Sequence, residues 1–160
     1  MAKKQTILIT GALGHIGSRL MRELDPALVE RVILLDNFAT QRFASLFNLP
    51  DKFPYEFIED DIRTADMDSY LKGVDAVIHL AAITDAETSH ARSEEVFGVN
   101  LEGTKKVAEA CLRQNAKLLF PSTTSVYGSQ AGRVDETSKD MTPQSPYAAS
   151  KLAAEQYLRT

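Results

Sequence analysis

The stretch TGALGHIGS at residues 10–18 restricts the fold of this chain more than any other segment. It overlaps the end of a short run rich in β-branched residues, TILIT at 6–10, and it leads into a segment with helical spacing at 16–23. Glycines at 11, 14 and 17 allow a tight turn, a close approach of the backbone to a ligand, and close packing of a helix on a strand. A glycine-rich turn in this context predicts a βαβ unit that binds a dinucleotide pyrophosphate at the helix N-terminus.

The glycines are spaced Gly-x-x-Gly-x-x-Gly, which differs from the usual Gly-x-Gly-x-x-Gly dinucleotide fingerprint. No Gly-Lys followed by Ser or Thr comes after the loop, which excludes a mononucleotide P-loop. A glycine-rich turn that only caps a structural helix stays open as the alternative. The candidate cofactor-binding residues of this segment are Gly11, Gly14, His15, Ile16 and Gly17.

Short apolar runs alternate with longer amphipathic stretches along the rest of the chain. Strands are expected at residues 6–10, 31–36, 55–59, 75–80 and 117–121. These runs lack clean polar–apolar alternation, so we expect strands that are buried on both faces, as in a parallel sheet. Helices are expected at 16–23, 40–47, 64–71, 89–97 and 99–114. The alternation of strands and helices predicts an α/β fold with βαβ units and right-handed crossovers.

The region after the last expected strand differs in composition. Residues 128–145 are rich in Gly, Ser, Asp, Glu and Pro and carry little apolar content, so we expect a long surface loop. Loops of this length in compact domains usually have a functional role or are mobile. A new helix is expected to begin at Pro146 and Tyr147.

Composition narrows the classes of function. The 160 residues are 44% hydrophobic and 25% charged with a net charge of −4, which indicates a single globular domain without a basic surface for nucleic acid. The single cysteine, Cys111, excludes an intramolecular disulfide framework and favours a reducing compartment. No signal peptide and no apolar run near the ~18 residues of a transmembrane helix is visible, so we expect a cytoplasmic protein that binds no membrane. The histidines and Cys111 show no ligand spacing, so no metal site is expected.

Asp36 ends the second expected strand, nineteen residues after Gly17. This spacing is close to the ~20 residues expected for the acid that binds the adenosine ribose of a dinucleotide. A carboxylate there hydrogen-bonds both ribose hydroxyls and repels a 2′-phosphate, which predicts NAD rather than NADP as the cofactor. Aspartate is also a common turn residue, and the adjacent Asn37 fits a turn too; Arg42 is a nearby cation that could weaken the preference.

The segment SPYAASK at 145–151 places Tyr147 and Lys151 four positions apart. On a helix this spacing puts both side chains on one face, one turn apart. A neighbouring ammonium favours the phenolate and makes tyrosine a usable proton acceptor. Because one Tyr-x-x-x-Lys pair can arise by chance on an exposed helix, the pair alone carries little weight.

With these segments in view, the chain resembles the extended short-chain dehydrogenase/reductases, and within them the NAD-dependent epimerase/dehydratase family that acts on nucleotide sugars. The resemblance covers the whole chain, and its motifs occur in the family's order. They are TGALGHIG (10–17), LDN (35–37), DDIR (60–63), HLAA (79–82), VNLEGT (99–104), STTSVYG (122–128) and SPYAASK (145–151). The resemblance implies a Rossmann-type doubly wound parallel sheet with helices on both faces over residues 1–160, and NAD as the cofactor.

The resemblance also implies contacts with the cofactor. Asp61 and Ile62 would lie against the adenine, and Asn100 would be the structural asparagine of the central helix. Further contacts are implied for Asn37, Leu80, Ala81 and Ala82. Two simpler interpretations stay open: Asp60 and Asp61 as a solvated turn, and HLAA as only the apolar end of a buried strand.

For catalysis, the resemblance implies that Thr123 hydrogen-bonds the reacting sugar hydroxyl and that Tyr147 is the catalytic base. Lys151 would be the partner of Tyr147 and would also bind the nicotinamide ribose. The choice of Thr123 rests on the resemblance, because Ser122, Thr124 and Ser125 are hydroxyl neighbours. Tyr127 is expected to be a packing or substrate-pocket residue rather than a second base.

The chain departs from the family pattern in two ways. Family dehydratases carry Asp-Glu directly after the catalytic threonine, whereas Thr124 and Ser125 stand there in this chain, which disfavours the 4,6-elimination branch. Family members also continue into a C-terminal sugar-nucleotide domain that these residues do not include, so we expect the N-terminal part of a longer enzyme.

We therefore expect an NAD-dependent enzyme that acts on a nucleotide-diphosphate sugar, with 4-epimerase-type chemistry through a keto intermediate. The resemblance further implies a homodimer, formed through the helices near 99–114 and from Tyr147 onward. Two alternatives stay open: a non-catalytic NAD-binding or association module, and a simple dehydrogenase or reductase of the same superfamily.

Overall fold

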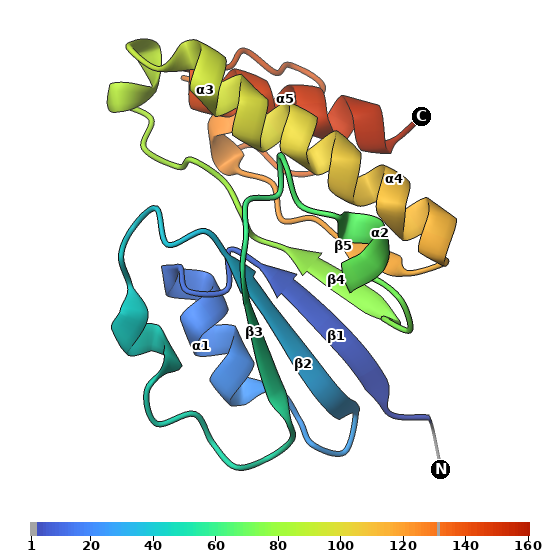
Figure 1. Cartoon of the computed structure of the whole chain (residues 1–160). Helices are drawn as coiled ribbons and strands as arrows, with labels where there is room; N and C mark the ends of the chain where they lie inside the picture. Colours follow the sequence, from blue (N-terminus) through green and yellow to red (C-terminus); the bar gives the residue numbers. More distant parts are fainter. Residues whose placement is uncertain (1–2, 131) are drawn as a thin grey trace. The chain divides into compact units, whose positions relative to one another are not determined.

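The computed structural model describes residues 3–130 and 132–160 (Figure 1). The chain divides into two compact units, which are described separately below. The first unit comprises residues up to 81 together with 106–120, and the second comprises 82–105 together with 121–160.

The first unit is built on a sheet of five parallel strands in the order β3-β2-β1-β4-β5. Ile7 of β1 pairs with Val32 of β2 on one side and with Ala76 of β4 on the other. The chain therefore winds outward from β1 in one direction and then returns to build β4 and β5 on its other side. In such a sheet the usual ligand crevice lies at the carboxyl ends of the strands between which the strand order reverses, here β1 and β4. The strand bounds are β1 Gln5–Thr10, β2 Val29–Asp36, β3 Tyr55–Glu59, β4 Ala76–His79 and β5 Lys117–Leu119.

Helices cover both faces of this sheet (Figure 1). Helix α1 (His15–Glu23) covers one face, and α2 (Met67–Tyr70) with the part of α4 (Thr104–Gln114) that begins at Lys106 covers the other. Side chains alternate across the strands, so the two faces receive different residues of β1. The expected doubly wound Rossmann-type sheet is confirmed.

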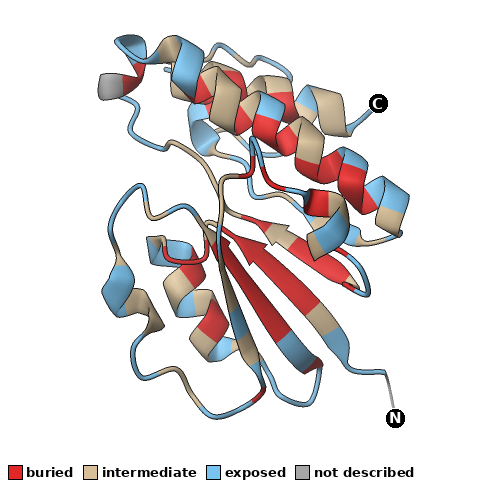
Figure 2. Ribbon diagram, viewed as in Figure 1, coloured by how far each residue is buried: buried red, intermediate tan, exposed pale blue. Residues whose placement is uncertain are grey.

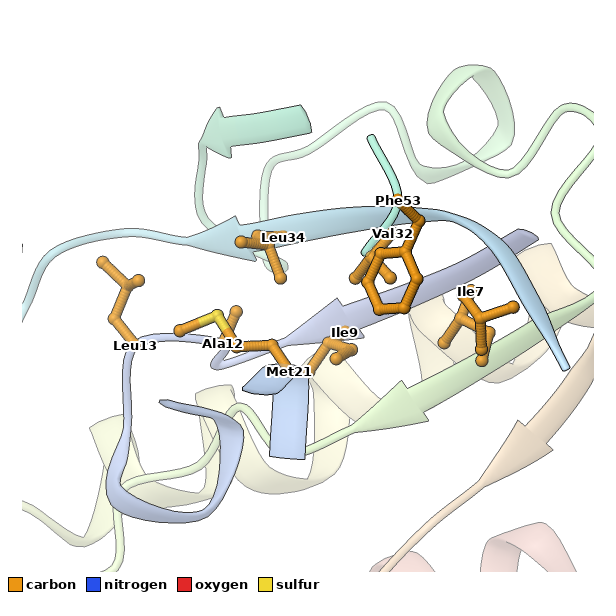
Figure 3. Close-up of a cluster of buried hydrophobic side chains, with 9 residues drawn as sticks. Ile7, Ile9, Ala12, Leu13, Met21, Val32, Leu34 and Phe53 are labelled. Carbon is orange, nitrogen blue, oxygen red and sulfur yellow. The ribbon is translucent and has the colours of Figure 1, made fainter. Parts of the chain in front are cut away.

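The core on the α1 side is a cluster of apolar side chains from strands, helix and loops (Figure 3). Ile7 and Ile9 of β1 pack there with Met21 of α1, and Met21 and Ile9 are fully buried. Complete burial of such side chains stabilises the fold by about 1.5–3 kcal/mol each. The other members are Ala12, Leu13, Val29, Val32, Leu34 and Phe53.

Burial on both faces holds for the central strands but not for the edges (Figure 2). In β2 the consecutive residues 32–35 are all buried, as expected for a central parallel strand. The expectation was wrong for β3 and β5, whose residues are only partly buried or exposed, because both strands lie at an edge of this sheet.

The helix expected at 40–47 was also wrong, since only the short 3₁₀ turn Phe43–Leu46 forms there. One carbonyl group within this turn and one just after it accept hydrogen bonds from a distant part of the chain. The guanidinium of Arg22 donates to the carbonyl oxygens of Ser45 at 2.9 Å and Phe47 at 2.8 Å. These long-range hydrogen bonds replace the local ladder of an α-helix. The helix expected at 64–71 is likewise reduced to α2.

The second unit is mainly helical. Its elements are the 3₁₀ turn Thr88–His90, helix α3 (Ser93–Phe97), a π-helical segment (Gly98–Gly103), the start of α4, the 3₁₀ turn Thr124–Tyr127 and helix α5 (Pro146–Leu158). The expectation of separate helices at 89–97 and 99–114 was wrong, because the first begins only at Ser93 and is joined to the second through Gly98. Gly98 has helical dihedral angles, φ −57° and ψ −43°, and α3 runs through the π-helical segment into α4 without interruption.

The loop at 128–145 is held at both ends. The hydroxyl of Thr142 donates to the carbonyl of Tyr127 at 3.0 Å, and Ser129 donates to the side-chain carbonyl of Gln144 at 3.0 Å. Gly128 has φ +65°, and a Cβ there would lie 2.1 Å from the carbonyl oxygen of Thr142. Only glycine therefore fits where the two ends of the loop meet.

Candidate functional site

Gly11 is required by the fold itself. It follows β1 with φ +65°, and an added Cβ would lie 2.6 Å from the backbone nitrogen of Ala81. The chain after β1 therefore crosses directly against the chain after β4, which only a residue without a side chain permits. Gly17 is similarly restricted, because a Cβ there would lie 2.5 Å from the carbonyl oxygen of Ala12 and would separate α1 from the loop.

Gly14 differs from these two glycines. Its φ of −63° suits any residue, and the one contact of an added Cβ is the carbonyl oxygen of Gly11 at 3.2 Å. Packing within the first unit therefore does not demand a glycine at this position. A hydrogen atom in place of a side chain leaves room for another group to approach the backbone.

The N-terminus of α1 follows directly from this loop. Gly14 is its N-cap and has no side chain, so no side-chain cap satisfies the N–H groups of the first turn. His15 and Ile16 begin the helix and are exposed, Ile16 to 66%. Free N–H groups and the positive end of the helix dipole make this terminus suited to an anionic ligand.

Asp36 is bonded to the glycine loop. Its carboxylate accepts from the backbone N–H of Leu13 and from that of Phe38, both at 3.0 Å. The residue is half-buried at the carboxyl end of β2. Asp36, the acid that the sequence predicts to bind the ribose, thus lies beside the glycine loop that is predicted to bind the pyrophosphate.

Asn37 and Asp61 connect the ends of β2 and β3. The side-chain amide of Asn37 donates to the Asp61 carboxylate at 3.1 Å, and Arg63 donates to the same group at 2.7 Å. The Arg63 guanidinium, through this hydrogen bond, holds the pKa of Asp61 well below its usual range, so Asp61 stays ionised at physiological pH. Ile62 beside it is buried.

The switch point between β1 and β4 contains a polar network that the sequence did not reveal. The hydroxyl of Thr10 is 2.6 Å from Nδ1 of His79, and both side chains are buried. The same hydroxyl accepts from the N–H of Ala81 at 3.2 Å, and the N–H of Leu80 donates to the Thr10 carbonyl at 3.0 Å. These bonds fix the backbone of Leu80 and Ala81 after β4. A histidine inside an otherwise apolar strand end was the available signal.

In the second unit, Asn100 is a buried connector. Its amide group donates to the Ile83 carbonyl at 2.9 Å and to the Ser150 hydroxyl at 3.0 Å, and its oxygen accepts from the Ile83 N–H at 2.8 Å. The hydroxyl of Thr104 donates to the Asn100 backbone carbonyl at 2.7 Å. Through these hydrogen bonds, Asn100 connects Ile83, which follows Ala82, to Ser150 in the first turns of α5.

Helix α5 begins with a capping interaction. The hydroxyl of Ser145 accepts from the N–H of Ala148 at 3.2 Å, and Pro146 occupies the first turn, where a missing N–H costs nothing. Tyr147 is half-buried in this first turn, and its carbonyl accepts from Ser150 at 2.8 Å. Ser150 also accepts a hydrogen bond from Asn100, so Ser150 links the backbone of Tyr147 to the buried Asn100 side chain.

Lys151 is 5% exposed, which is unusual for a lysine. Its Nζ donates to the carbonyl of Pro121 at 2.7 Å. Burial lowers the pKa of the Lys151 ammonium to about 8, and the negative charge of Glu155 partly opposes this shift. With this pKa, Lys151 remains mostly protonated at neutral pH, so a positive charge is held in the second unit.

Thr123 belongs to the same unit as Tyr147 and Lys151. It is the N-cap of the 3₁₀ turn Thr124–Tyr127, and its hydroxyl accepts from the N–H of Ser125 at 3.2 Å. Ser122, Thr124 and Ser125 are exposed, whereas Thr123 is partly buried. Among these four hydroxyl residues, Thr123 is thus the one that is partly buried and caps the 3₁₀ turn.

The predicted site residues fall into two groups. The first unit carries Gly11, Gly14, His15, Ile16, Gly17, Asp36, Asn37, Asp61, Ile62, Leu80 and Ala81, and the second carries Ala82, Asn100, Thr123, Tyr147 and Lys151. Among the described residues, no three His, Cys, Asp or Glu side chains come together in a way that could hold a metal ion. No helix in the described part of the chain has the length and apolar content needed to cross a membrane.

Comparison with known proteins identifies the family. Residues 7–160 match the model of the NAD dependent epimerase/dehydratase family. The uncharacterized UDP-glucose epimerase YtcB of Bacillus subtilis (strain 168) is 36% identical over 93% of this chain and 49% of its own length. A dTDP-glucose 4,6-dehydratase of Streptomyces niveus is 33% identical over 93% of this chain and 47% of its own length.

Solved structures give the same result. A UDP-N-acetylglucosamine 4-epimerase from Methanobrevibacter ruminantium M1, in complex with UDP-N-acetylmuramic acid, has a TM-score of 0.88 at 31% identity, covering 99% of this chain and 50% of that one. A mutant UDP-glucuronic acid 4-epimerase from Bacillus cereus, in complex with UDP-4-deoxy-4-fluoro-glucuronic acid and NAD, has a TM-score of 0.87 at 33% identity, covering 96% and 51%. The chain spans about half the length of the relatives it matches.

Proposed function

The chain belongs to the NAD-dependent epimerase/dehydratase family, and from this membership we propose that it is the cofactor-binding part of an NAD-dependent nucleotide-sugar 4-epimerase. The observation that carries the proposal is the buried Lys151 ammonium one helical turn after Tyr147. Burying an ammonium has a free-energy cost, so a fold that keeps one beside a tyrosine indicates a chemical role.

The first unit fits the cofactor. Gly14 leaves its backbone open at the N-terminus of α1, where a pyrophosphate can accept hydrogen bonds from N–H groups. The Asp36 carboxylate at the end of β2 suits the ribose hydroxyls and repels an added 2′-phosphate, which favours NAD over NADP. Asn37 and Asp61, which are hydrogen-bonded to each other, form the neighbouring surface proposed for the adenine, and the buried Ile62 follows Asp61 in the chain.

The second unit supplies the proton transfer. We assign Tyr147 as the base that removes the proton from the sugar C4 hydroxyl, because the Lys151 cation lowers the free energy of the phenolate. Thr123 holds that hydroxyl by a hydrogen bond, which reduces the entropy lost in reaching the reactive geometry. When bound, NAD⁺ supplies the chemistry of accepting and returning a hydride at C4. Tyr147 then returns the proton to the C4 oxygen, so its phenolate is regenerated at the end of the cycle.

The residues after Thr123 favour epimerase over dehydratase chemistry, although relatives of both kinds match the chain. Elimination across a sugar ring needs an acid to protonate the leaving hydroxyl. Thr124 and Ser125 are exposed hydroxyl residues and cannot serve as that acid. A simple dehydrogenase of the same superfamily is distinguished by net formation of NADH.

The full-length natural protein tests the proposal with UDP-glucose and NAD. We expect the C4 epimer to form without accumulation of NADH, as followed by NMR of the sugar and by absorbance at the NADH band. Tyr147→Phe keeps the ring and removes the hydroxyl, so turnover should fall by about 10²–10⁴-fold with cofactor affinity retained. Equal turnover by the parent and Tyr147→Phe would refute the role of Tyr147. Stoichiometric NADH would identify a dehydrogenase, and NAD binding without turnover of UDP-glucose would favour a binding module.

Two further proposals follow from the family resemblance. We propose a homodimer formed through α4 and α5, because Leu112 of α4 is 82% exposed and a second copy would cover it. We also propose a cytoplasmic location, because Cys111 is a free, buried thiol and the chain has no other cysteine with which to form a disulfide.

A further inference from the structure

Two consecutive residues that precede Thr123 are bonded to helix α5. The carbonyl of Pro121 accepts from Nζ of Lys151 at 2.7 Å, and the hydroxyl of Ser122 donates to the carboxylate of Glu155. Lys151 and Glu155 are one helical turn apart, so both bonds come from one face of α5. All of these residues belong to the second unit.

The Glu155 carboxylate is more enclosed than a surface charge. Its side chain is 17% exposed, while its ion-pair partner Arg159, at 3.3 Å, is 72% exposed. An ion pair with so exposed a partner contributes little to stability. A hydrogen bond from a neutral hydroxyl to a carboxylate is one of the stronger kinds. The bond from Ser122 is therefore more important for the Glu155 carboxylate than the ion pair with Arg159.

Ser122 is followed immediately by Thr123, which starts the 3₁₀ turn. Thr123 has an extended backbone, φ −144° and ψ 144°, and its hydroxyl accepts from the N–H of Ser125 at 3.2 Å. A rotation of the exposed Ser122 segment would carry the Thr123 hydroxyl with it. A fixed Ser122 therefore fixes where the Thr123 hydroxyl lies.

We propose that Glu155 is a positioning residue, which fastens Ser122 to α5 and thereby sets the Thr123 hydroxyl in its place in the unit that carries Tyr147 and Lys151. The catalytic meaning of this contact rests on the proposed epimerase function, but the fastening itself does not. Glu155 has a second effect through its charge, since it supports the protonated form of Lys151 against burial. Variants that separate the hydrogen bond from the charge distinguish the two effects.

Ser122→Ala removes only the hydroxyl, and Glu155→Ala removes both the acceptor and the charge. Glu155→Gln keeps an acceptor oxygen for Ser122 and removes the charge. Ser122→Thr restores a hydroxyl and is the rescue variant. Arg159→Gln is the matched control, because it removes the exposed partner of the same carboxylate and leaves Ser122 bonded.

The first measurement is amide hydrogen exchange by NMR on the full-length protein, which requires no substrate. The amide of Ser125 should exchange about tenfold faster in Ser122→Ala and Glu155→Ala, because its acceptor on Thr123 is no longer held. The amide of Ala149, which is bonded to Ser145 at the start of α5, should not change. Arg159→Gln and Ser122→Thr should match the parent.

The second measurement is turnover of UDP-glucose with NAD. In Ser122→Ala, kcat should fall about tenfold with NAD affinity and melting temperature unchanged, and Ser122→Thr should restore it. Glu155→Gln should retain more activity than Glu155→Ala. Unchanged Ser125 exchange overturns the proposal, and so does faster exchange with parental kcat. If the parent itself fails to epimerise UDP-glucose, the proposed function fails, and the exchange measurement alone decides whether Glu155 fastens this segment.

Discussion

The carboxylate of Asp36 accepts a hydrogen bond from the backbone N–H of Leu13 at 3.0 Å, which joins the end of β2 to the glycine loop after β1. A single aspartate therefore has two consequences for the proposed cofactor site. It places a negative charge where a 2′-phosphate would have to lie, and it holds the loop that surrounds Gly14.

Asp36→Ala should narrow the difference between NAD and NADP affinity by about 1–3 kcal/mol and should also weaken NAD binding, because the loop loses its anchor. Asp36→Asn is the matched control, since its amide oxygen can still accept from Leu13 while the charge is lost. We expect it to narrow the difference but to retain more NAD affinity. Calorimetric titration with both cofactors measures this. Equal NAD and NADP affinity in the parent would contradict the role of Asp36.

Gly14 and Gly11 should respond differently to substitution. Gly14→Val should abolish NAD binding with a nearly parental melting curve, because an added Cβ there meets only the carbonyl oxygen of Gly11, at 3.2 Å, whereas the side chain blocks a ligand. Gly11→Ala should destabilise the fold itself, since the added Cβ clashes with the backbone at Ala81. Calorimetry and thermal unfolding separate the two effects. Parental NAD affinity in Gly14→Val would show that the loop does not bind phosphate.

Lys151 should make stability depend on pH in a defined direction. The pKa of the Lys151 ammonium is about 8 in the folded chain, against an ordinary value of 10.5 for lysine. Between these values the unfolded state binds more protons, so unfolding free energy should rise with pH by at most about 1.4 kcal/mol per pH unit. Lys151→Met removes the titrating group and is the control. The parent should gain stability relative to Lys151→Met between pH 8 and 10 in chemical denaturation; a constant difference would contradict the lowered pKa.

Asn100→Leu should destabilise the second unit. The substitution leaves the N–H and C=O of Ile83 and the hydroxyl of Ser150 without their buried partner. Losses of this kind cost about 1–3 kcal/mol or more, which lowers the melting temperature by several degrees. Thr104→Val removes the hydrogen bond from its hydroxyl to the Asn100 carbonyl but keeps Asn100 bonded to Ile83 and Ser150, and should cost less. Equal melting temperatures for the parent and Asn100→Leu would show that this network does not support the fold.

Leu112→Glu should weaken self-association if α4 contributes to a homodimer. The side chain is 82% exposed, so the substitution costs little in an isolated copy but places a charge in an apolar interface. Light scattering across a concentration series measures the change. Glu109→Gln, on the same helix, is the control for altered surface charge. A strictly monomeric parent at high concentration would remove the dimer proposal.

The parts of the fold that the sequence predicted are those fixed by local requirements. Gly11 and Gly17 could be recognised because a side chain at either position would clash with nearby backbone atoms. Positions of this kind recur at a fixed spacing in such loops. The strands were found because each contains an uninterrupted apolar run, at 7–9 in β1 and at 32–35 in β2, as is typical of central parallel strands. Lys151 and Tyr147 could be paired because helical spacing alone puts them on one face.

The parts that the sequence did not predict depend on long-range hydrogen bonds. Nothing near residues 40–47 indicates that Arg22 satisfies the carbonyl groups there and so removes the need for an α-helix. Separate helices were expected at 89–97 and 99–114, but the π-helical segment joins them, and Asn100 within that segment bonds Ile83 and Ser150. The contact between Ser122 and Glu155 joins residues thirty-three positions apart, and neither residue carried a signal of its own.

The closed base of the loop at 128–145 has a consequence for how this protein could diversify. Thr142 binds back to Tyr127, and Gly128 packs against the Thr142 carbonyl, so the chain leaves and returns at one fixed point. The interior of the loop can then be lengthened, shortened or exchanged while Thr123 on one side and Tyr147 on the other keep their positions. New recognition surfaces can thus be sampled by natural variation without rebuilding the residues proposed for chemistry.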